Sequence, residues 1–427
     1  MTGETARRDF LRVLGGGAIG AALAGCGTFG RQPNSKSKTT LWYWNRSLDD
    51  DFLAQANKQF PSLNLEPNKI AVDFKPKVLT TLAGGSYVPD ITNINSDIAT
   101  YFPDESQFVD LYDLGAKKVE HLYLPWKWDL GITAGGKMVG FPIDTGPTAF
   151  MYRMDLFEKA GLPSDPAAVE KQVATWDGYF DLGTKLQAKV PSTKFVHNIN
   201  TVYTMGLAQS PKQYFDKQNK FIGDQAHVKN AWDNAVEAKK RNLSARVLQD
   251  WSSDWSAAVS SGGIATVNHA VWAAYIVKEA APDTSGKWRV CHGPGPAGNS
   301  GGSFMSITKY SRRPELAFEF IKWLQSPDLQ TKTYNAIQLF PSATSSLADK
   351  SMETPDKFFG GQPVGKIFGD VAKELVPAYY SPYESVVSAS FTNELLNVEN
   401  LGKNPDKAWE DALSDARRQI KHKGLSV

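Results

Sequence analysis

The sequence predicts an α/β protein, and three observations lead to this fold class. Residues 39–44 form a continuous apolar segment, typical of a strand buried on both faces of a sheet. A polar loop and a helical pattern follow directly, as in the first βα unit of a doubly wound sheet. Further on, the apolar runs 138–143 and 149–151 flank Asp144-Thr-Gly-Pro147, a bend with a permissive Gly and a φ-restricted Pro. Two strands joined by such a bend and followed by a helix indicate a crossing between two lobes.

The N-terminal segment predicts export rather than fold. Arg7-Arg8 resembles the twin-arginine motif, and an apolar Gly/Ala-rich run extends from 13 to 24. Leu23-Ala-Gly-Cys26 fits a lipobox, in which the cysteine becomes the acylated first residue; the alternative is a plain signal peptide with a chance cysteine. We therefore expect residues 1–25 to be a signal peptide that is removed after export by the twin-arginine pathway. A flexible tether, 26–38, would then hold the protein on the outer face of the cytoplasmic membrane.

Composition excludes several classes of protein. The chain has 427 residues and a formal net charge of +2, which argues against a nucleic-acid partner. No apolar run reaches the roughly 18 residues of a membrane span. With Cys26 acylated, Cys291 is the one remaining cysteine, so no structural disulfide is expected.

Local patterns place the helices in chain order. Three acidic residues at 49–51 favour the start of a helix whose apolar positions follow helical spacing. A second helix, 76–83, ends at Gly84-Gly85, and residues 89–97 form a strand that ends in polar side chains. After the crossing, Asp155 is expected to cap a short helix that Gly161 ends. Further helices are expected after Thr175, over 225–240, from Pro314 and from Asn404-Pro405 to Gly424.

Most sequence motifs of known catalytic sites are absent. The chain has no G-x-S-x-G, H-E-x-x-H, C-x-x-C or Walker motif. The formal G-x-G-x-x-G at 293–298 contains two prolines and reads as a loop. Six scattered histidines show no metal-ligand spacing, so we expect no metal and no cofactor. Asp97 and Asp144 fall at strand ends and leave open a glycosidase with two carboxyl groups.

Residues 136–162 resemble the signature of the family 1 extracellular solute-binding proteins of ABC importers, which include the maltose-binding proteins. Other segments match the family in its order: 89–90, 108–111, 261–272, 301–307 and 339–342, with Thr266 where Met is common. The resemblance implies a periplasmic-binding-protein type II-like fold, two doubly wound lobes with flanking helices joined by three hinge crossings. Lobe 1 would comprise 39–143 and 304–338, and lobe 2 would comprise 144–303 and 339–427.

The resemblance also implies ligand contacts at strand ends and crossings, where aromatic rings stack on sugar rings and polar groups bind hydroxyls. The residues it indicates are Trp44, Asn45, Arg46, Asp97, Asp144, Asn200, Tyr203, His269, Trp272, Ser303, Phe304, Tyr379 and Tyr380. For some of them a structural role is the alternative: Trp44 in the core, Asp97 as a helix cap, Asp144 in the hinge. Trp251 and Trp255 are interpreted as packing residues.

The sequence therefore predicts a monomeric, lipid-anchored binding protein without catalytic residues. It would close on an oligosaccharide and deliver it to the transmembrane subunits of an ABC permease. Three alternatives remain open: a polar ligand such as a glycerol phosphodiester, a surface glycosidase, and an adhesion lipoprotein.

Overall fold

The computed structural model describes residues 38–375 and 378–425. The predicted signal peptide, Cys26 and nearly all of the tether lie outside the described residues. The strands are β1 (Thr39–Tyr43), β2 (Leu65–Lys69), β3 (Ile91–Ile94), β4 (Phe141–Pro142), β5 (Thr148–Arg153), β6 (Thr266–Ala270), β7 (Trp288–Cys291) and β8 (Phe304–Ile307).

Helices account for most of the remaining regular structure. In the first half of the chain they are α1 (Asp50–Gln59), α2 (Phe74–Gly84), α3 (Pro125–Asp129), α4 (Met154–Lys159), α5 (Pro166–Val173), α6 (Trp176–Lys189) and α7 (Ile199–Ala208). In the second half they are α8 (Ala226–Lys240), α9 (Ser253–Ser261), α10 (Trp272–Ala280), α11 (Pro314–Leu324), α12 (Pro327–Ile337), α13 (Thr344–Leu347), α14 (Val364–Glu374), α15 (Glu384–Leu401) and α16 (Pro405–His422). The 3₁₀ segments are η1 (Pro61–Leu63), η2 (Ile98–Gln107), η3 (Ala116–Leu122), η4 (Pro282–Thr284) and η5 (Lys350–Glu353).

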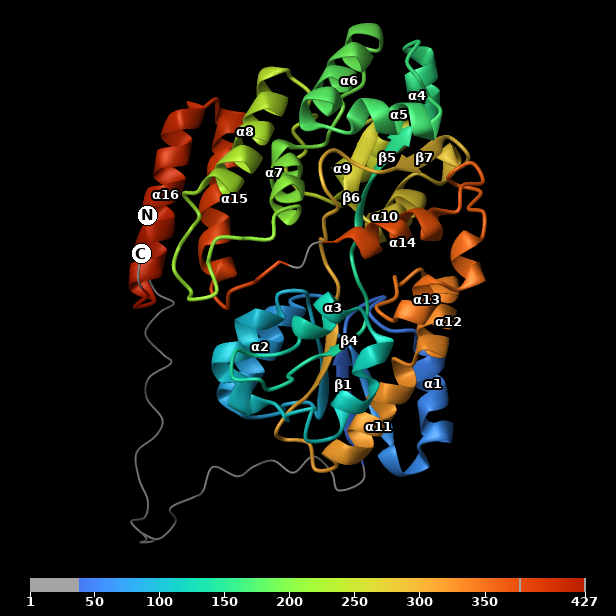
Figure 1. Cartoon of the computed structure of the whole chain (residues 1–427), viewed down its shortest axis with the longest axis vertical. Helices are drawn as coiled ribbons and strands as arrows, with labels where there is room; N and C mark the ends of the chain where they lie inside the picture. Colours follow the sequence, from blue (N-terminus) through green and yellow to red (C-terminus); the bar gives the residue numbers. More distant parts are fainter. Residues whose placement is uncertain (1–37, 376–377, 426–427) are drawn as a thin grey trace, which may run out of the picture. The chain divides into compact units, whose positions relative to one another are not determined.

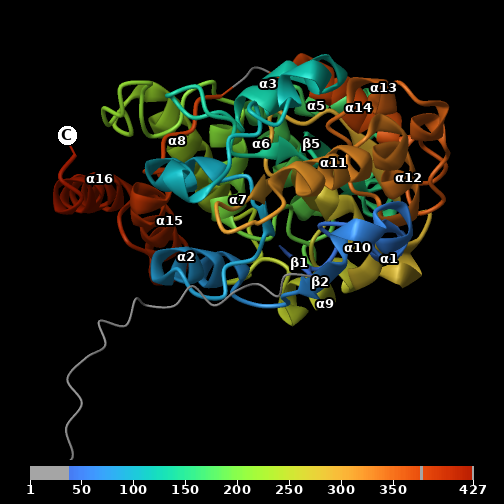
Figure 2. The ribbon, with the colours of Figure 1, turned by 90° about the horizontal axis from the view of Figure 1, so that it is seen from below.

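The first lobe is built on a five-stranded sheet in the order β2-β1-β3-β8-β4. Strand β1 pairs in parallel with β2 and β3, whereas β8 runs antiparallel to both β3 and β4. Helix α2 lies on one face, and α1 and α11 lie on the other (Figures 1 and 2). Helices cover both faces at β3, β4 and β8, whose residues are all buried, whereas β1 and β2 alternate between more and less buried positions.

The pleat of β8 shows how one strand serves both faces of this sheet. Phe304 belongs to the apolar cluster that contains Val78 and Leu82 of α2. The next residue, Met305, belongs to the cluster on the opposite face with Phe318 of α11. Successive side chains of a strand point to opposite faces. The second crossing therefore ends in a strand that both layers of helices hold in place.

The second lobe carries a three-stranded sheet in the order β6-β5-β7. Both pairings are antiparallel, so this sheet differs from the doubly wound sheet that the resemblance implies. Two isolated parallel bridges, Lys194↔Ile264 and Val196↔Ser244, lie beside it. Strand β5, which follows the first crossing, is the central strand, with β6 on one side and β7 on the other. The two-lobe α/β fold itself is confirmed.

Helix termini test the local predictions. Thr175 caps α6 through a side-chain bond to a backbone N–H group, as the sequence predicts. Asp49, the first of the three acidic residues at the predicted helix start, caps α1 in the same way. The prediction for Asp155 is wrong. Arg153 stands at the N-cap of α4, and its guanidinium forms two hydrogen bonds of 2.7 Å with the Asp155 carboxylate. The ion pair thus takes the carboxylate that a cap would need.

Among the described residues, no helix is both long and apolar enough to span a bilayer. Cys291 ends β7 as a buried free thiol.

Candidate functional site

Three chain segments pass between the lobes and bind one another. The first leads from β4 to β5, the second leads from β7 to β8, and the third follows α12. Ile143 N–H donates to the Ser303 carbonyl at 3.0 Å and Thr145 N–H to the Phe340 carbonyl at 2.9 Å, while the Ser342 hydroxyl donates to the Ile143 carbonyl at 3.1 Å. The backbone groups of the crossings are therefore satisfied by the neighbouring crossings.

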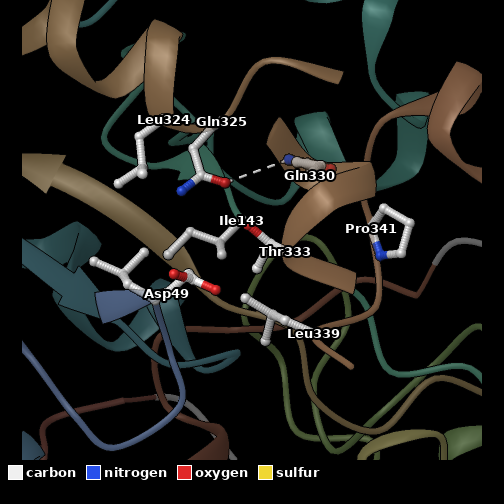
Figure 3. A pocket seen from close by; sticks show the side chains of 9 residues that line it. Asp49, Ile143, Leu324, Gln325, Gln330, Thr333, Leu339 and Pro341 are labelled. Carbon is white, nitrogen blue, oxygen red and sulfur yellow. Dashed lines mark hydrogen bonds between the residues drawn. The ribbon is translucent and has the colours of Figure 1, made fainter. Parts of the chain in front are cut away.

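Gln330 of α12 anchors the third crossing. Its Oε1 accepts from the N–H groups of Ser342 and Ala343, both at 2.9 Å, and its Nε2 donates to Ser342 Oγ at 3.0 Å. Figure 3 shows Gln330 joined to Gln325 beside a cavity that Ile143, Thr333 and Leu339 also line. That cavity measures about 10 Å³, room for about one water molecule, so it supports the hinge and holds no larger ligand.

A much larger cavity lies against the crossings, and we call it the hinge pocket. Its volume is about 700 Å³. Its walls come from the loops after β1 and β3, the three crossings and α10. The lining residues are Trp44, Asn45, Arg46, Ser47, Asn95, Ser96, Asp97, Asp144, Trp272, Ile276, Glu279, Gly301, Gly302, Ser303, Ile337, Gln338 and Leu339.

The loop after β1 supplies one wall of the hinge pocket. Trp44 packs edge-on against Phe74, with ring centroids 4.9 Å apart. The Arg46 guanidinium lies 3.0 Å from the centroid of the Tyr275 ring of α10 and donates to the Ile337 carbonyl. Burial lowers the pKa of Arg46, and neighbouring Tyr275 opposes this shift. Arg46 thus already has an aromatic ring and a carbonyl as partners.

Asp97 and Asp144 both line this pocket, with different partners. Asp97 forms an ion pair with Lys75, and its side chain makes no capping bond to η2. Asp144 is 8% exposed, and its Oδ1 accepts from the Ser303 N–H at 2.7 Å and from the Ser303 hydroxyl. Burial raises the pKa of Asp144, while Lys127 and the Ser303 bonds oppose the rise. The first and second crossings therefore meet at this carboxylate.

Trp272 is the first residue of α10, and its ring is held from several sides. Its indole Nε1–H donates to the Ser300 carbonyl at 2.9 Å. The rings of His269 and Trp251 pack against it with centroids 4.6 and 5.1 Å away. His269 is buried, and burial lowers the pKa of this imidazole to about 3, so it is neutral at physiological pH. His269 therefore supports Trp272 and does not line the pocket.

A second cavity adjoins the hinge pocket, and we call it the aromatic pocket. Its volume is about 220 Å³, and Ser96 lines both cavities. First-lobe residues of η2, α3 and the flanking loops face second-lobe residues across it. The lining residues are Ser96, Ile98, Ala99, Phe102, Trp126, Asp129, Leu130, Ile132, Lys217, Ala378, Tyr379 and Tyr380. Tyr379 donates its hydroxyl to Asn219 at 3.0 Å, whereas the indole N–H of Trp126 is buried without a hydrogen-bond partner in the described part of the chain.

Besides His269, three residues that the resemblance indicates as ligand contacts line neither pocket. Tyr203 of α7 is fully buried, and its hydroxyl bonds that of Tyr214, so it is a core residue. Asn200 donates to the Thr392 carbonyl of α15 and lines neither pocket. Phe304 is fully buried in β8. Asn200 and Tyr203 are held by contacts of α7 with α8 and α15, and Phe304 is held between the two layers of helices on the first sheet, so these residues depart from the sequence-based predictions.

A family model of bacterial extracellular solute-binding proteins matches residues 47–360. The chain belongs to this family. The lactose-binding protein of Rhizobium radiobacter is 26% identical to this solute-binding protein over 411 residues, covering 91% of this chain and 92% of the relative. A solved extracellular solute-binding protein of family 1 is 30% identical, with a TM-score of 0.83 and coverage of 90% of this chain and 99% of that one.

Two further structures share the fold. The binding protein of Bifidobacterium animalis subsp. lactis in complex with β-1,6-galactobiose is 21% identical and has a TM-score of 0.76, covering 91% and 99% of the two chains. The galacto-N-biose-/lacto-N-biose I-binding protein of Bifidobacterium longum is 22% identical and has a TM-score of 0.75, covering 91% and 98%.

Sequence reasoning missed several pocket residues of this solute-binding protein. Ile276 and Glu279 follow Trp272 by four and seven positions, so helical spacing alone places them on the same face of α10. Asn95 and Ser96 belong to the polar strand end that indicated Asp97. No local signal distinguishes the pocket residue Trp126 from Trp128 two positions later, which is fully buried in the core.

Within residues 38–375 and 378–425, no group of three or more His, Cys, Asp or Glu side chains is placed to hold a metal ion.

Proposed function

We propose that this solute-binding protein captures a neutral oligosaccharide between its lobes, in the hinge pocket and the aromatic pocket together. The observation that carries the proposal is the adjacency of the two cavities at Ser96. One provides carboxylates, amides and hydroxyls around Trp272, and the other provides aromatic rings. Sugar hydroxyls need hydrogen-bond partners, and the C–H faces of sugar rings stack on aromatic surfaces.

The charges of the hinge pocket favour a neutral ligand over a phosphodiester. Among the described residues that line it, Arg46 is the only cation, beside the carboxylates of Asp97, Asp144 and Glu279. Arg46 already has the Tyr275 ring and the Ile337 carbonyl as partners. A phosphate would therefore meet more negative than positive charge. The sugars named for the relatives, lactose, β-1,6-galactobiose and lacto-N-biose, agree with a neutral ligand.

The proposal includes a site of action and a partner. The lipobox ending at Cys26 supports a lipid anchor on the outer face of the cytoplasmic membrane, after twin-arginine export. Ligand that contacts both lobes would shift the protein toward a closed form, which docks on the transmembrane subunits of an ABC permease. Asn200, Tyr203 and Phe304 have no role in ligand contact in this proposal, and the ligand leaves unaltered.

A fluorescence titration tests this function. The full-length chain carrying Cys26→Ser, which cannot be acylated, is titrated with lactose, β-1,6-galactobiose, lacto-N-biose, maltotriose and glycerophosphocholine. We expect a saturable change in tryptophan emission with at least one sugar, and recovery of that sugar intact.

Two outcomes would contradict the proposal. Recovery of shorter sugars would establish a glycosidase, and a response to glycerophosphocholine alone would establish a phosphodiester-binding protein. Trp323→Phe is a matched control for the fluorescence change. This indole packs against Phe60 and Phe320 in the first lobe and lines neither pocket, so its removal should leave the change with sugar intact.

A further inference from the structure

Lys127 is a buried cation beneath the crossings that the proposed function leaves unused. It lies in α3, is 1% exposed, and its Nζ has no protein hydrogen-bond partner in the described part of the chain. The ammonium lies 3.4 Å from the centroid of the Phe304 ring. Taking an ammonium out of water costs several kcal/mol unless nearby groups offset the loss. A charge at this position therefore calls for a functional reason.

Gly302 brings Lys127 close to the first crossing. Gly302 has a φ of +89°, and a Cβ added there would lie 3.0 Å from Lys127 Nζ and 2.7 Å from the Asp144 carbonyl oxygen. Only a glycine leaves this space open, because any side chain would meet both the cation and the first crossing. Lys127 Nζ thus lies close to the backbone of the segment that carries the Asp144 carboxylate, and Lys127 is not among the residues that line the hinge pocket.

The charges around Asp144 single out Lys127 as its partner. Lys127 is the charged group that acts on the Asp144 carboxyl, and Asp144 is the charged group that acts on Lys127. The other charged side chains of the hinge pocket are engaged elsewhere. Asp97 pairs with Lys75, Arg46 lies on the Tyr275 ring, and Glu279 accepts from the Tyr275 hydroxyl.

We propose that Lys127 is a positioning residue that keeps Asp144 ionised, so that Asp144 accepts hydrogen bonds from a sugar hydroxyl. Both bonds from Ser303 reach Oδ1, so the ligand would use Oδ2. An ionised carboxylate only accepts hydrogen bonds, whereas a protonated one presents a donor there. A nearby cation in a low-dielectric site favours the ionised form. This inference rests on the proposed function and adds that the recognised group is a hydroxyl donor.

The sign of the pH effect follows from the direction of each shift. Burial raises the pKa of Asp144, and the positive charge of Lys127 makes this rise smaller. Burial lowers the pKa of Lys127 to about 7, so this amine carries its charge below that pH. Without the cation, Asp144 becomes protonated at a higher pH, and ligand affinity is lost at that higher pH.

The decisive variant is Lys127→Met in the full-length Cys26→Ser chain, titrated between pH 4.5 and 9 with the tightest-binding sugar of the panel. We expect the acid limb of the affinity profile to move up by at least one pH unit, with wild-type affinity at pH 9. A purely structural role would lower affinity equally at every pH, and that result would overturn the inference. Adding Asp144→Asn should abolish the pH dependence. Lys127→Gln provides a second neutral side chain if the Met variant does not fold.

A readout without ligand separates this inference from the proposed function. The Asp144 carboxyl carbon is followed by ¹³C NMR in aspartate-labelled protein and assigned by its loss in Asp144→Asn. Its titration midpoint should rise in Lys127→Met, and an unchanged midpoint would overturn the inference even if sugars bind. A raised midpoint in a protein that binds no sugar of the panel would support the Lys127–Asp144 coupling and overturn the proposed function.

Discussion

The hinge pocket and the aromatic pocket adjoin at Ser96 but differ in chemistry. The hinge pocket, about 700 Å³, contains Arg46 and three carboxylates around Trp272. The aromatic pocket, about 220 Å³, is lined by Phe102, Trp126, Tyr379 and Tyr380. Hydrogen-bonding groups distinguish one hydroxyl pattern from another, whereas ring faces accept many sugars. Under the proposed function, the hinge pocket would select the sugar and the aromatic pocket would select its length.

The pockets also differ in how firmly their walls are held. The three crossings that form the floor of the hinge pocket bind one another through Ile143, Thr145 and Ser342. The aromatic pocket is closed by side chains from opposite lobes, with Trp126 on one side and Tyr380 on the other. A movement of the lobes would therefore change the aromatic pocket more than the floor of the hinge pocket.

The largest expected effect concerns the charge beneath the hinge pocket. Because the pKa of Lys127 is lowered to about 7 from 10.5, the unfolded chain holds more protons on this group between pH 7 and 10.5. Stability from this group is thus present at high pH and is lost as pH falls toward 7. The free energy of unfolding should rise by about 3 kcal/mol from pH 7 to 9.5 because of Lys127.

Urea denaturation at several pH values measures this contribution. The Lys127→Met chain serves as the reference, because the tyrosines and the other lysines titrate equally in both proteins. Identical pH dependence in the two chains would contradict a desolvated cation beneath the hinge pocket.

The second effect tests whether Trp272 is the platform of the hinge pocket. Trp272→Ala removes an indole ring that is held by the Ser300 carbonyl and packed by His269. We expect a loss of about 2 kcal/mol in binding, or about 30-fold in Kd, for every sugar that binds. Isothermal titration calorimetry measures the loss. Wild-type affinity in this variant would show that the sugar stacks on an aromatic residue other than Trp272.

The third effect tests the role assigned to the aromatic pocket. Tyr380→Ala removes one ring from its wall and leaves the hinge pocket unchanged. A trisaccharide should lose about 1 kcal/mol of binding, whereas its disaccharide core should bind as before. The measurement is a pair of calorimetric titrations. Equal losses for both sugars would mean that the two pockets do not divide the ligand as we propose.

The smallest effect on binding is expected at Tyr203. Tyr203→Phe breaks a 2.8 Å hydroxyl–hydroxyl bond with Tyr214 inside the second lobe. The free energy of unfolding should fall by about 1 kcal/mol, with no change in Kd for any sugar. Thermal unfolding and calorimetry on the same preparation give both values. A higher Kd in this variant would show that Tyr203 contributes to ligand binding.

The sequence allowed much of the fold to be predicted, because local patterns coincide with the buried faces. The predicted helix over 225–240 is α8, which buries Val228, Ala231, Trp232, Ala235 and Val236. The antiparallel second sheet was not predictable, since apolar strands carry no signal of direction. Tyr203 was predicted as a ligand contact although it is a core residue. Helix α7 is buried on almost every side, so its sequence shows no polar face that would distinguish a core position from a pocket position.

The site, like the fold, contains residues that the sequence indicated and others that it did not. Trp44, Arg46, Asp144 and Trp272, which the resemblance indicates as ligand contacts, all line the hinge pocket. Whether each contacts a ligand stays a prediction. Lys127 belongs to the short segment Pro125-Trp-Lys-Trp128, whose letters do not show that its ammonium is buried. Burial of a single charge depends on Gly302, which is distant in sequence, and no local pattern contains that information.

The central claim is that one sugar chain occupies both pockets. A calorimetric comparison of a disaccharide with the trisaccharide that extends it, both on the full-length Cys26→Ser chain, tests this most directly. The account predicts binding of one sugar per chain in both cases, with at least a fivefold lower Kd for the trisaccharide. Equal affinities would contradict a ligand that spans both pockets, and binding of neither sugar would contradict the carbohydrate assignment.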